Sequence, residues 1–260
     1  AFLLESMCRA TRSLLPRAHR TMLTVDFDYF DIQPGHICVD LGCGEGRHAL
    51  TAYLGSDVTV LGFDLSHADL KTAQSRITDM APHNPQGAVH FIQTNGIALP
   101  LADQSVDRLI CSEVLEHIPN YVSFLEEIDR VLKPDGRVCI SVPRAWPEWV
   151  CWKLCDAYRR TPGGHIRIFD ATHLKREVER YTFTSTRRHG AHALHAPYWW
   201  LRCIFWETQP EPLILRLYHR FLVWDLMERP LVTRALEAVL NPWLGKSVVL
   251  YFDRSDRDRH

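Results

Sequence analysis

Three glycines at alternate positions, preceded by an aspartate, could form a ligand-binding loop. The segment HICVDLGCGEGRHA contains Asp40 followed by Gly42, Gly44 and Gly46. An apolar run at 37–39 precedes the glycines and a helical pattern follows them, which predicts a buried strand, a tight turn and a helix N-terminus. Glycine permits positive φ and brings backbone close to a ligand. The N–H groups at the start of a helix favour an anionic or carboxylate-bearing ligand.

The position of the third glycine separates two classes of nucleotide-binding loop. The dinucleotide pattern G-x-G-x-x-G would require a glycine at position 47, but this residue is Arg47. The pattern here is D-x-G-x-G-x-G, which disfavours a dinucleotide-binding reductase. Two roles for Arg47 stay open: contact with a ligand carboxylate, or a place on the helix surface.

A second acidic residue lies where it could bind a ribose. The apolar run VTVLGF at 58–63 predicts a buried strand that ends at Asp64. An acidic residue at the end of the second strand can accept both ribose hydroxyls of an adenosine. The alternative is a charge that only stabilises the N-terminus of the next helix.

Further segments follow in the order of one α/β family. A strand predicted at 88–93 precedes Asn95-Gly96-Ile97, and ALPLADQSVDRLICSEVLEHIPN covers a fourth strand and the start of a helix. The turn LKPDG then precedes the strand VCISVP. Together with VDLGCGEG, these segments resemble the class I S-adenosylmethionine-dependent methyltransferases of the type 11-like, small-molecule kind. The resemblance covers roughly residues 30–145 and is weaker beyond them.

The resemblance implies that S-adenosylmethionine is the cofactor and S-adenosylhomocysteine the product. Asp40 would hold the loop near the cofactor's amino group. Asn95 stands where the family often has an Asp that receives the adenine amino group, and the Asn side-chain oxygen can still accept that bond. The backbone after the fourth strand would line the methionine end. The expected cofactor-binding residues are Asp40, Gly42, Cys43, Gly44, Gly46, Asp64, Leu65, Asn95, Gly96, Ile97, Ser112 and Glu113.

Histidine and glutamate side chains after the fourth strand could remove a proton from the acceptor. Methyl transfer from a sulfonium requires alignment, exclusion of water and, for some acceptors, a base. We expect His117, His165 and Glu116 to be catalytic, with His195 as a further candidate base. Histidine has a suitable pKa, although each of these residues could instead be structural or face solvent.

The histidines at 189, 192 and 195 are spaced by three. On a helix, two of them could share a metal ion, but this stretch is predicted to be a strand. We therefore expect no bound metal.

Strands alternate with helices, which predicts a parallel sheet with right-handed crossovers. The resemblance implies a Rossmann-like, doubly wound, seven-stranded mixed sheet of order 3-2-1-4-5-7-6 with a helical cap insertion. The predicted helices are 3–20, 46–54, 66–80, 120–132 and 171–181. The first strand is predicted at the apolar run 37–39, and the further predicted strands are 57–63, 88–93, 106–112, 137–142, 182–195 and 246–252.

The chain is expected to be a single methyltransferase domain over residues 1–260. Its expected parts are an N-terminal helical segment 1–35, a cofactor-binding core 36–195, a cap 197–242 and a last strand 246–253. The cap is rich in aromatic residues, which favours an apolar substrate pocket. The alternatives are an inserted helical core and a membrane-facing patch. The expected pocket residues are Trp146, His195, Tyr198 and Trp199.

Composition narrows the choice of partners. A chain of 260 residues suits one α/β domain with an insertion, and a net charge of −1 disfavours nucleic acid as the main partner. No apolar run reaches about 18 residues, so no spanning helix is predicted, and the first residues do not resemble a signal peptide. Eight cysteines without a C-x-x-C pair predict reduced thiols and a cytoplasmic location.

The predicted function is methyl transfer from S-adenosylmethionine to a small, hydrophobic or lipid-like acceptor. After the fourth strand, the sequence Ser112-Glu113-Val114-Leu115 lacks the N/D-P-P-Y motif of methyltransferases that act on exocyclic amines of DNA. The alternative is a catalytically silent S-adenosylmethionine-binding partner or regulatory protein. A peripheral membrane contact stays open, and the sequence does not predict an oligomeric state.

Overall fold

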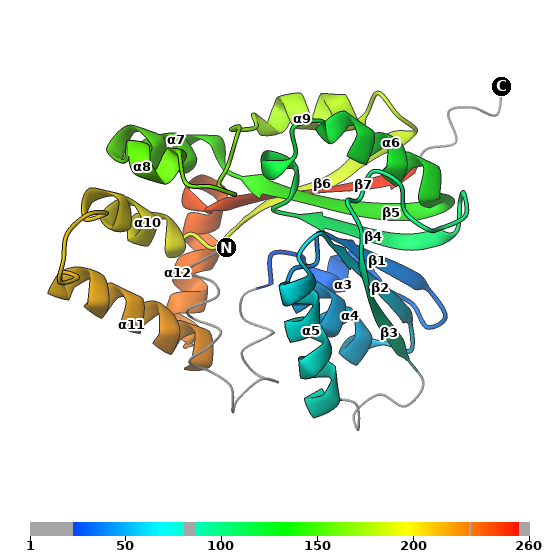
Figure 1. The fold of residues 1–260 in the computed structure, drawn as a ribbon, viewed down its shortest axis with the longest axis horizontal. Coiled ribbons are helices and arrows are strands. Elements are labelled where there is room, and N and C mark those ends of the chain that lie inside the picture. The colour runs from blue at the N-terminus through cyan, green and yellow to red at the C-terminus, as the bar shows by residue number, and fades with distance from the viewer. Residues whose placement is uncertain (1–22, 81–86, 229, 255–260) are drawn as a thin grey trace. The chain divides into compact units, whose positions relative to one another are not determined.

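The computed structural model describes residues 23–80, 87–228 and 230–254 (Figure 1). The helix predicted at 3–20 and the charged C-terminal tail lie outside these residues. The described part contains two compact units. The sheet unit comprises residues 24–145, 165–189 and 247–254, and the helical unit comprises residues 146–164 and 190–246.

The sheet has seven strands in the order β3-β2-β1-β4-β5-β7-β6, which confirms the expected topology. Strands β1 to β5 pair in parallel, and β7 runs antiparallel to β5. The strands are β1 (Ile37–Leu41), β2 (Thr59–Asp64), β3 (Ala88–Gln93), β4 (Val106–Ser112), β5 (Leu132–Pro143), β6 (Phe183–Ala191) and β7 (Ser247–Arg254).

Side chains of β1 alternate between the two faces of the sheet. Val39 and Leu41 join the cluster that includes the buried faces of α6 (Tyr121–Val131) and α9 (Ala171–Val178). Asp40, between them, points to the opposite face and accepts a hydrogen bond from α4 (Arg47–Gly55). Helices therefore cover both faces, as a doubly wound fold requires.

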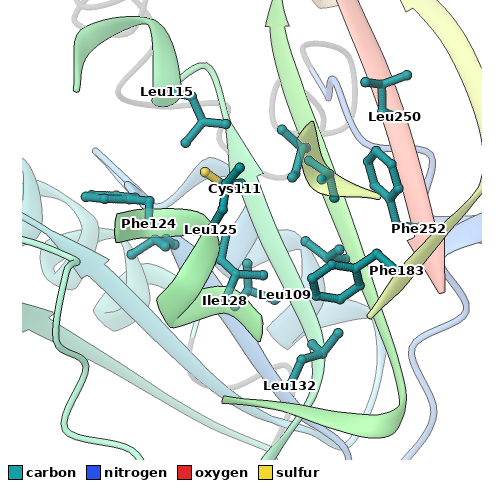
Figure 2. Packing of buried hydrophobic residues seen from close by; sticks show 14 of the residues in the cluster. Leu109, Cys111, Leu115, Phe124, Leu125, Ile128, Leu132, Phe183, Leu250 and Phe252 are labelled. Atoms are coloured by element: carbon teal, nitrogen blue, oxygen red, sulfur yellow. The ribbon is translucent and has the colours of Figure 1, made fainter. Parts of the chain in front are cut away.

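The largest hydrophobic cluster lies under α6 (Figure 2). Phe124, Leu125 and Ile128 of that helix pack on Leu109 and Cys111 of β4, and the cluster continues to β7 and β6. Side chains of this cluster support the carboxyl end of β4. The cluster therefore fixes the position at which the next segment begins.

The remaining sheet-unit helices are short or lie at strand ends. Helix α5 (His67–Met80) begins after Ser66, whose Oγ accepts the Asp69 N–H at 3.3 Å, as expected of a helix cap. Helix α3 (Phe27–Phe30) brings Phe30, which is fully buried, toward Tyr251 of β7. A 3₁₀ turn, η2 (Leu115–His117), follows β4.

Two strands differ from the predicted bounds by four residues or more at one end. β5 starts at Leu132 rather than 137, because Leu132 already pairs with Val106 before a register shift ahead of Arg108. β6 ends at Ala191 rather than 195, because His192 has a φ of 63° that extended backbone does not tolerate. Residue 195 is instead the first residue of a helix.

The helical unit contains α8 (Asp156–Arg159), α10 (His195–Ile204), α11 (Leu213–Glu228) and α12 (Leu231–Leu244), and most of α7 (Ala145–Leu154). Helices over the Trp-rich stretch that follows Pro143 were not predicted. Tyr198, Leu215 and Leu222 form one buried cluster, and Cys151, Cys155 and Cys203 form another with surrounding aromatic rings.

The cysteines in the described part of the chain are buried free thiols, as predicted from their spacing. Burial raises the pKa of Cys38 and Cys139. These cysteines therefore act as small apolar side chains. Within the described residues, no helix combines the length and hydropathy needed to cross a membrane.

We expect Ile128→Ala to lower the free energy of unfolding by about 2–5 kcal/mol, because it leaves a cavity in the largest cluster. Val122→Ala on the same helix, where the side chain is exposed, should cost less than about 1 kcal/mol. Urea denaturation measures both variants. Equal losses would show that α6 does not carry the core contact assigned to it.

Candidate cofactor site

The glycine loop after β1 is held by backbone hydrogen bonds to β2. The N–H groups of Gly42 and Cys43 both donate to the Phe63 carbonyl, at 2.7 and 2.9 Å. Gly42, Gly44 and Gly46 all have positive φ, at 76°, 51° and 81°. The loop thus adopts the conformation for which alternate glycines were predicted.

The three glycines have different neighbours. A Cβ on Gly42 would collide with the Val114 side chain, and one on Gly46 would lie 2.9 Å from both Ala73 and Phe91. A Cβ on Gly44 would have no atom within 4 Å. Gly42 and Gly46 are therefore required for packing, whereas Gly44 borders open space.

Asp64 connects this loop to the start of α5. Its Oδ2 accepts the Gly44 N–H at 2.7 Å, and its Oδ1 accepts the Ser66 N–H at 2.8 Å. A carboxylate has about four lone-pair sites. Each oxygen therefore keeps capacity for one more donor, which matches the two hydroxyls of a ribose.

Asp40 lies beneath the loop and is almost fully buried. Its Oδ2 accepts the N–H of Ala49 in α4 at 2.9 Å. Burial raises the pKa of Asp40 to about 7, while the Ala49 hydrogen bond and the positive charge of Arg47 act in the opposite direction. Nη2 of Arg47 donates to the hydroxyl oxygen of Thr24 at 3.4 Å. Arg47 therefore contacts another segment of the protein.

The ends of β2 and β3 present apolar side chains beside hydrogen-bonding groups. Leu65 is 70% exposed and Ile97 is 48% exposed, which is high for large aliphatic residues. Asn95 is exposed, and its Oδ1 accepts the Ile97 N–H at 3.3 Å. Gly96 has a φ of 75° and packs closely on Phe124. Because β2 and β3 are neighbours, these groups lie at one edge of the sheet.

Ser112 and Glu113 form a polar network at the end of β4. The hydroxyls of Ser112 and Ser141 lie 2.8 Å apart, and Ser141 donates to Oε1 of Glu113 at 2.9 Å. Glu113 has a φ of 57°, a strained conformation for this residue, and its N–H donates to the Ser141 carbonyl at 3.0 Å. The sequence prediction missed Ser141, although its polar side chain in the apolar strand VCISVP was a signal.

The three residues expected to be catalytic come together beyond β4. The imidazoles of His117 and His165 have centroids 5.0 Å apart, and His117 Nε2 lies 3.8 Å from Oε1 of the fully buried Glu116. One nitrogen or oxygen from each residue lies within 4.8 Å of the other two, so this group is also able to hold a metal ion.

The four residues expected to line the acceptor pocket all belong to the helical unit. Tyr198 is buried, and its ring lies 6.2 Å from that of Trp199. Trp146 is 46% exposed and donates from Nε1 to the Trp243 carbonyl at 2.9 Å. His195 begins α10 and lies 5.6 Å from the His192 ring. Many rings of this unit therefore pack on one another, and a role in an acceptor pocket stays a prediction.

The three regularly spaced histidines have separate surroundings. His189 lies on β6, contacts the Thr24 carbonyl at 3.2 Å and stacks on Tyr251. His192 and His195 belong to the helical unit and group with Glu237 of α12. The spacing alone could not distinguish these environments, because the strand ends between His189 and His192.

Comparison with known proteins identifies the family. Residues 32–185 match a family described as the methyltransferase domain. This match covers more than half of the chain, so the chain belongs to that family, and the resemblance to class I S-adenosylmethionine-dependent methyltransferases is confirmed. S-adenosylmethionine is the cofactor that the family implies.

Individual relatives share the sequence of the core. The chain is 31% identical over 127 residues to Methyltransferase GfsG of Streptomyces halstedii, over 49% of this chain and 45% of that protein. It is 37% identical over 106 residues to demethylmenaquinone methyltransferase of Lactococcus lactis, over 40% of each. The chain thus spans about half or less of these relatives' own length.

A solved structure, the YcgJ protein of Bacillus subtilis, has a similar fold. It has a TM-score of 0.59 and 17% identity, and the match covers 92% of this chain and 98% of that one. At this identity the likeness concerns the fold alone.

The residues present fit the cofactor. The space beside Gly44 would take its methionine half, Asp64 has hydrogen-bonding capacity for the ribose, and the exposed aliphatic side chains of Leu65 and Ile97 would cover an apolar ring face. The residues in these three observations lie at or just after the ends of three adjacent strands, β1, β2 and β3.

Gly44→Val should greatly weaken S-adenosylmethionine binding, because the new side chain enters the open space beside the loop, and the strain at its φ of 51° should lower the melting temperature modestly. Gly46→Val, the matched control, should lower the melting temperature further, because its side chain also meets Ala73 and Phe91. Calorimetry and thermal melting separate the two effects. Wild-type affinity in the Gly44 variant would mean that the loop is only a turn.

Asp64→Ala should weaken S-adenosylmethionine binding at least tenfold, because each charge-assisted hydrogen bond contributes about 1.5–3 kcal/mol. Asp69→Ala is the control, since this carboxylate lies in the first turn of α5. Loss of a screened surface charge changes an affinity by roughly twofold at most, so we expect a smaller change than that in this variant. Titration calorimetry measures both. A folded Asp64 variant with an unchanged dissociation constant would contradict the ribose assignment.

Stability should depend on pH through Asp40. Its pKa of about 7 in the folded protein exceeds the value of about 3.9 expected in the unfolded chain. The folded state therefore holds a proton that the unfolded state releases, so this contribution to stability falls as pH rises from about 4 to about 7. Asn has no such titration, and Asp40→Asn should gain stability relative to wild type across that window. Urea unfolding at several pH values tests this, and a constant difference would contradict it.

Proposed function

We propose that this chain transfers a methyl group from S-adenosylmethionine to a small, hydrophobic or lipid-like acceptor. The observation that supports this best is the open space at Gly44 beside the Asp64 carboxylate, within a methyltransferase domain. When bound, S-adenosylmethionine supplies a methyl group on a sulfonium; transfer breaks that sulfur–carbon bond, forms a bond to the acceptor and leaves S-adenosylhomocysteine.

The residues of the sheet unit would position the cofactor. Asp64 accepts the ribose hydroxyls, and the Asn95 oxygen or the backbone N–H groups of Gly96 and Ile97 meet the adenine. Ser112 and Glu113 lie at the methionine end. Their mutual hydrogen bonds through Ser141 hold the backbone rigid, and such preorganisation lowers the cost of alignment.

The group of Glu116, His117 and His165 would handle the acceptor's proton. Glu116 and His117 follow β4 and His165 lies against His117, while Val114, two residues before Glu116, packs against Gly42 of the cofactor loop. A hydroxyl acceptor loses its proton on methylation, so a histidine within reach can receive it. Glu116 is buried beside His117 and would orient that ring.

Two observations support an apolar acceptor. The demethylmenaquinone methyltransferase of Lactococcus lactis, to which the core is 37% identical, acts by its name on a quinone. The helical unit also exposes large apolar side chains: Trp149 is 55% exposed and Trp243 is 77% exposed. Further exposed apolar side chains lie along α12, namely Leu231, Val232 and Val239, and an extended apolar surface is typical of sites that bind an apolar partner.

A radiolabelled methyl donor and a panel of acceptors test the proposal. We expect labelled product with quinols that carry an isoprenoid chain and much less with charged acceptors of similar size. Trp199→Ala and Trp200→Ala should lower acceptor turnover with cofactor affinity near wild type. Cofactor binding without turnover of any acceptor would favour a silent regulatory protein, and turnover only of charged acceptors would contradict an apolar pocket.

A further inference from the structure

The sheet unit brings two imidazoles and one carboxylate together from segments 48 residues apart, Glu116–His117 and His165. The closest measured approach between ligand atoms is 3.8 Å, from His117 Nε2 to Glu116 Oε1. Ligands bound to one Zn²⁺ at about 2.0–2.2 Å lie about 3.4 Å apart. In this structure the ligand atoms of the three residues lie within 4.8 Å of one another. Small side-chain rotations would therefore bring them to the spacing that a bound ion requires.

The loop that carries His165 is fixed onto the segment after β4. The N–H of Ile166 donates to the Glu116 carbonyl at 3.0 Å. The guanidinium of Arg167 donates to the Pro119 carbonyl at 2.7 Å and lies 4.8 Å from the centre of the Tyr121 ring. These contacts hold His165 against His117 before any ligand arrives, and a prearranged site binds a metal ion more tightly.

The set of donor atoms selects a class of ion. Two imidazole nitrogens and one carboxylate suit Zn²⁺, Mn²⁺, Fe²⁺ or Co²⁺, whereas Mg²⁺ and Ca²⁺ prefer oxygen ligands alone. Three protein ligands leave at least one coordination position open, which is typical of catalytic rather than structural metal sites. Since Glu116 is buried and His117 is one-third exposed, an open position would face the His117 side.

We propose that Glu116, His117 and His165 bind a divalent transition-metal ion whose open position takes an oxygen atom of the acceptor. The role of the acceptor in this inference rests on the proposed function, whereas the metal site does not depend on it. An acceptor hydroxyl that coordinates the ion releases its proton to solvent more readily, so in this proposal the two histidines act as metal ligands in place of the proton-accepting base, and the hydroxyl oxygen is then the nucleophile. The proposal favours oxygen acceptors, such as a quinol, over carbon acceptors.

Cobalt binding tests the site without any turnover. The other such group in the described part of the chain, His192, His195 and Glu237, is first disabled by Glu237→Ala. In this background, the ligand-field absorption of Co²⁺ should saturate at one equivalent. His165→Ala should weaken binding by about tenfold or more. The matched control is His173→Ala, an exposed histidine of α9 whose imidazole lies 3.7 Å from the Glu177 carboxylate; it should leave Co²⁺ affinity unchanged.

Each outcome bears on the proposal. Saturable binding lost in His165→Ala but retained in His173→Ala supports it. No saturable Co²⁺ binding, or equal binding by both variants, overturns it. If the metal-free enzyme, treated with a chelator, still methylates its acceptor at the full rate, the ion has no role in the reaction and the proposal fails while the methyltransferase function stands. Co²⁺ binding without methylation of any acceptor would overturn the acceptor role of the ion and the proposed function, and leave a metal site.

Discussion

The carboxylate of Asp64 determines how the glycine loop is presented to a ligand. It accepts one backbone N–H from the loop and one from the start of α5, at 2.7 and 2.8 Å. Because a single side chain holds both segments, the space at Gly44 and the exposed side chain of Leu65 stay in fixed relation to each other. The loop after β1, the end of β2 and the first turn of α5 are thus joined through one side chain.

The sheet makes this arrangement possible because its parallel strands end at one edge. β1, β2 and β3 place the loop, Asp64 and Asn95 side by side, and β4 with β5 places the Ser112–Ser141–Glu113 network beyond β1. Two acidic residues near this edge are held in unfavourable states. Asp40 has a raised pKa because it is buried, and Glu113 holds a strained backbone conformation. Both lie beside the proposed cofactor site, and strain and perturbed pKa values concentrate at functional sites.

The sequence predicted the sheet unit well because its signals are local. The glycine spacing, the acidic residue at the end of β2 and the helix predicted from residue 66 each depend on a few neighbouring residues, and the strand order followed from the family resemblance. The end of β6 could not be predicted, since it depends on the left-handed backbone of His192. The early start of β5 depends on pairing with Val106, a contact between strands. The sequence predicted that His165 and His117 are both catalytic, but not how close they lie, because their closeness depends on Arg167 and the Ile166 N–H.

The glycine loop is expected to bind S-adenosylmethionine rather than a dinucleotide. Titration calorimetry of the purified chain with S-adenosylmethionine and, in parallel, with NAD distinguishes the two ligands. We expect saturable binding of S-adenosylmethionine at one equivalent and no measurable heat with NAD. Binding of NAD, with none of S-adenosylmethionine, would contradict this expectation.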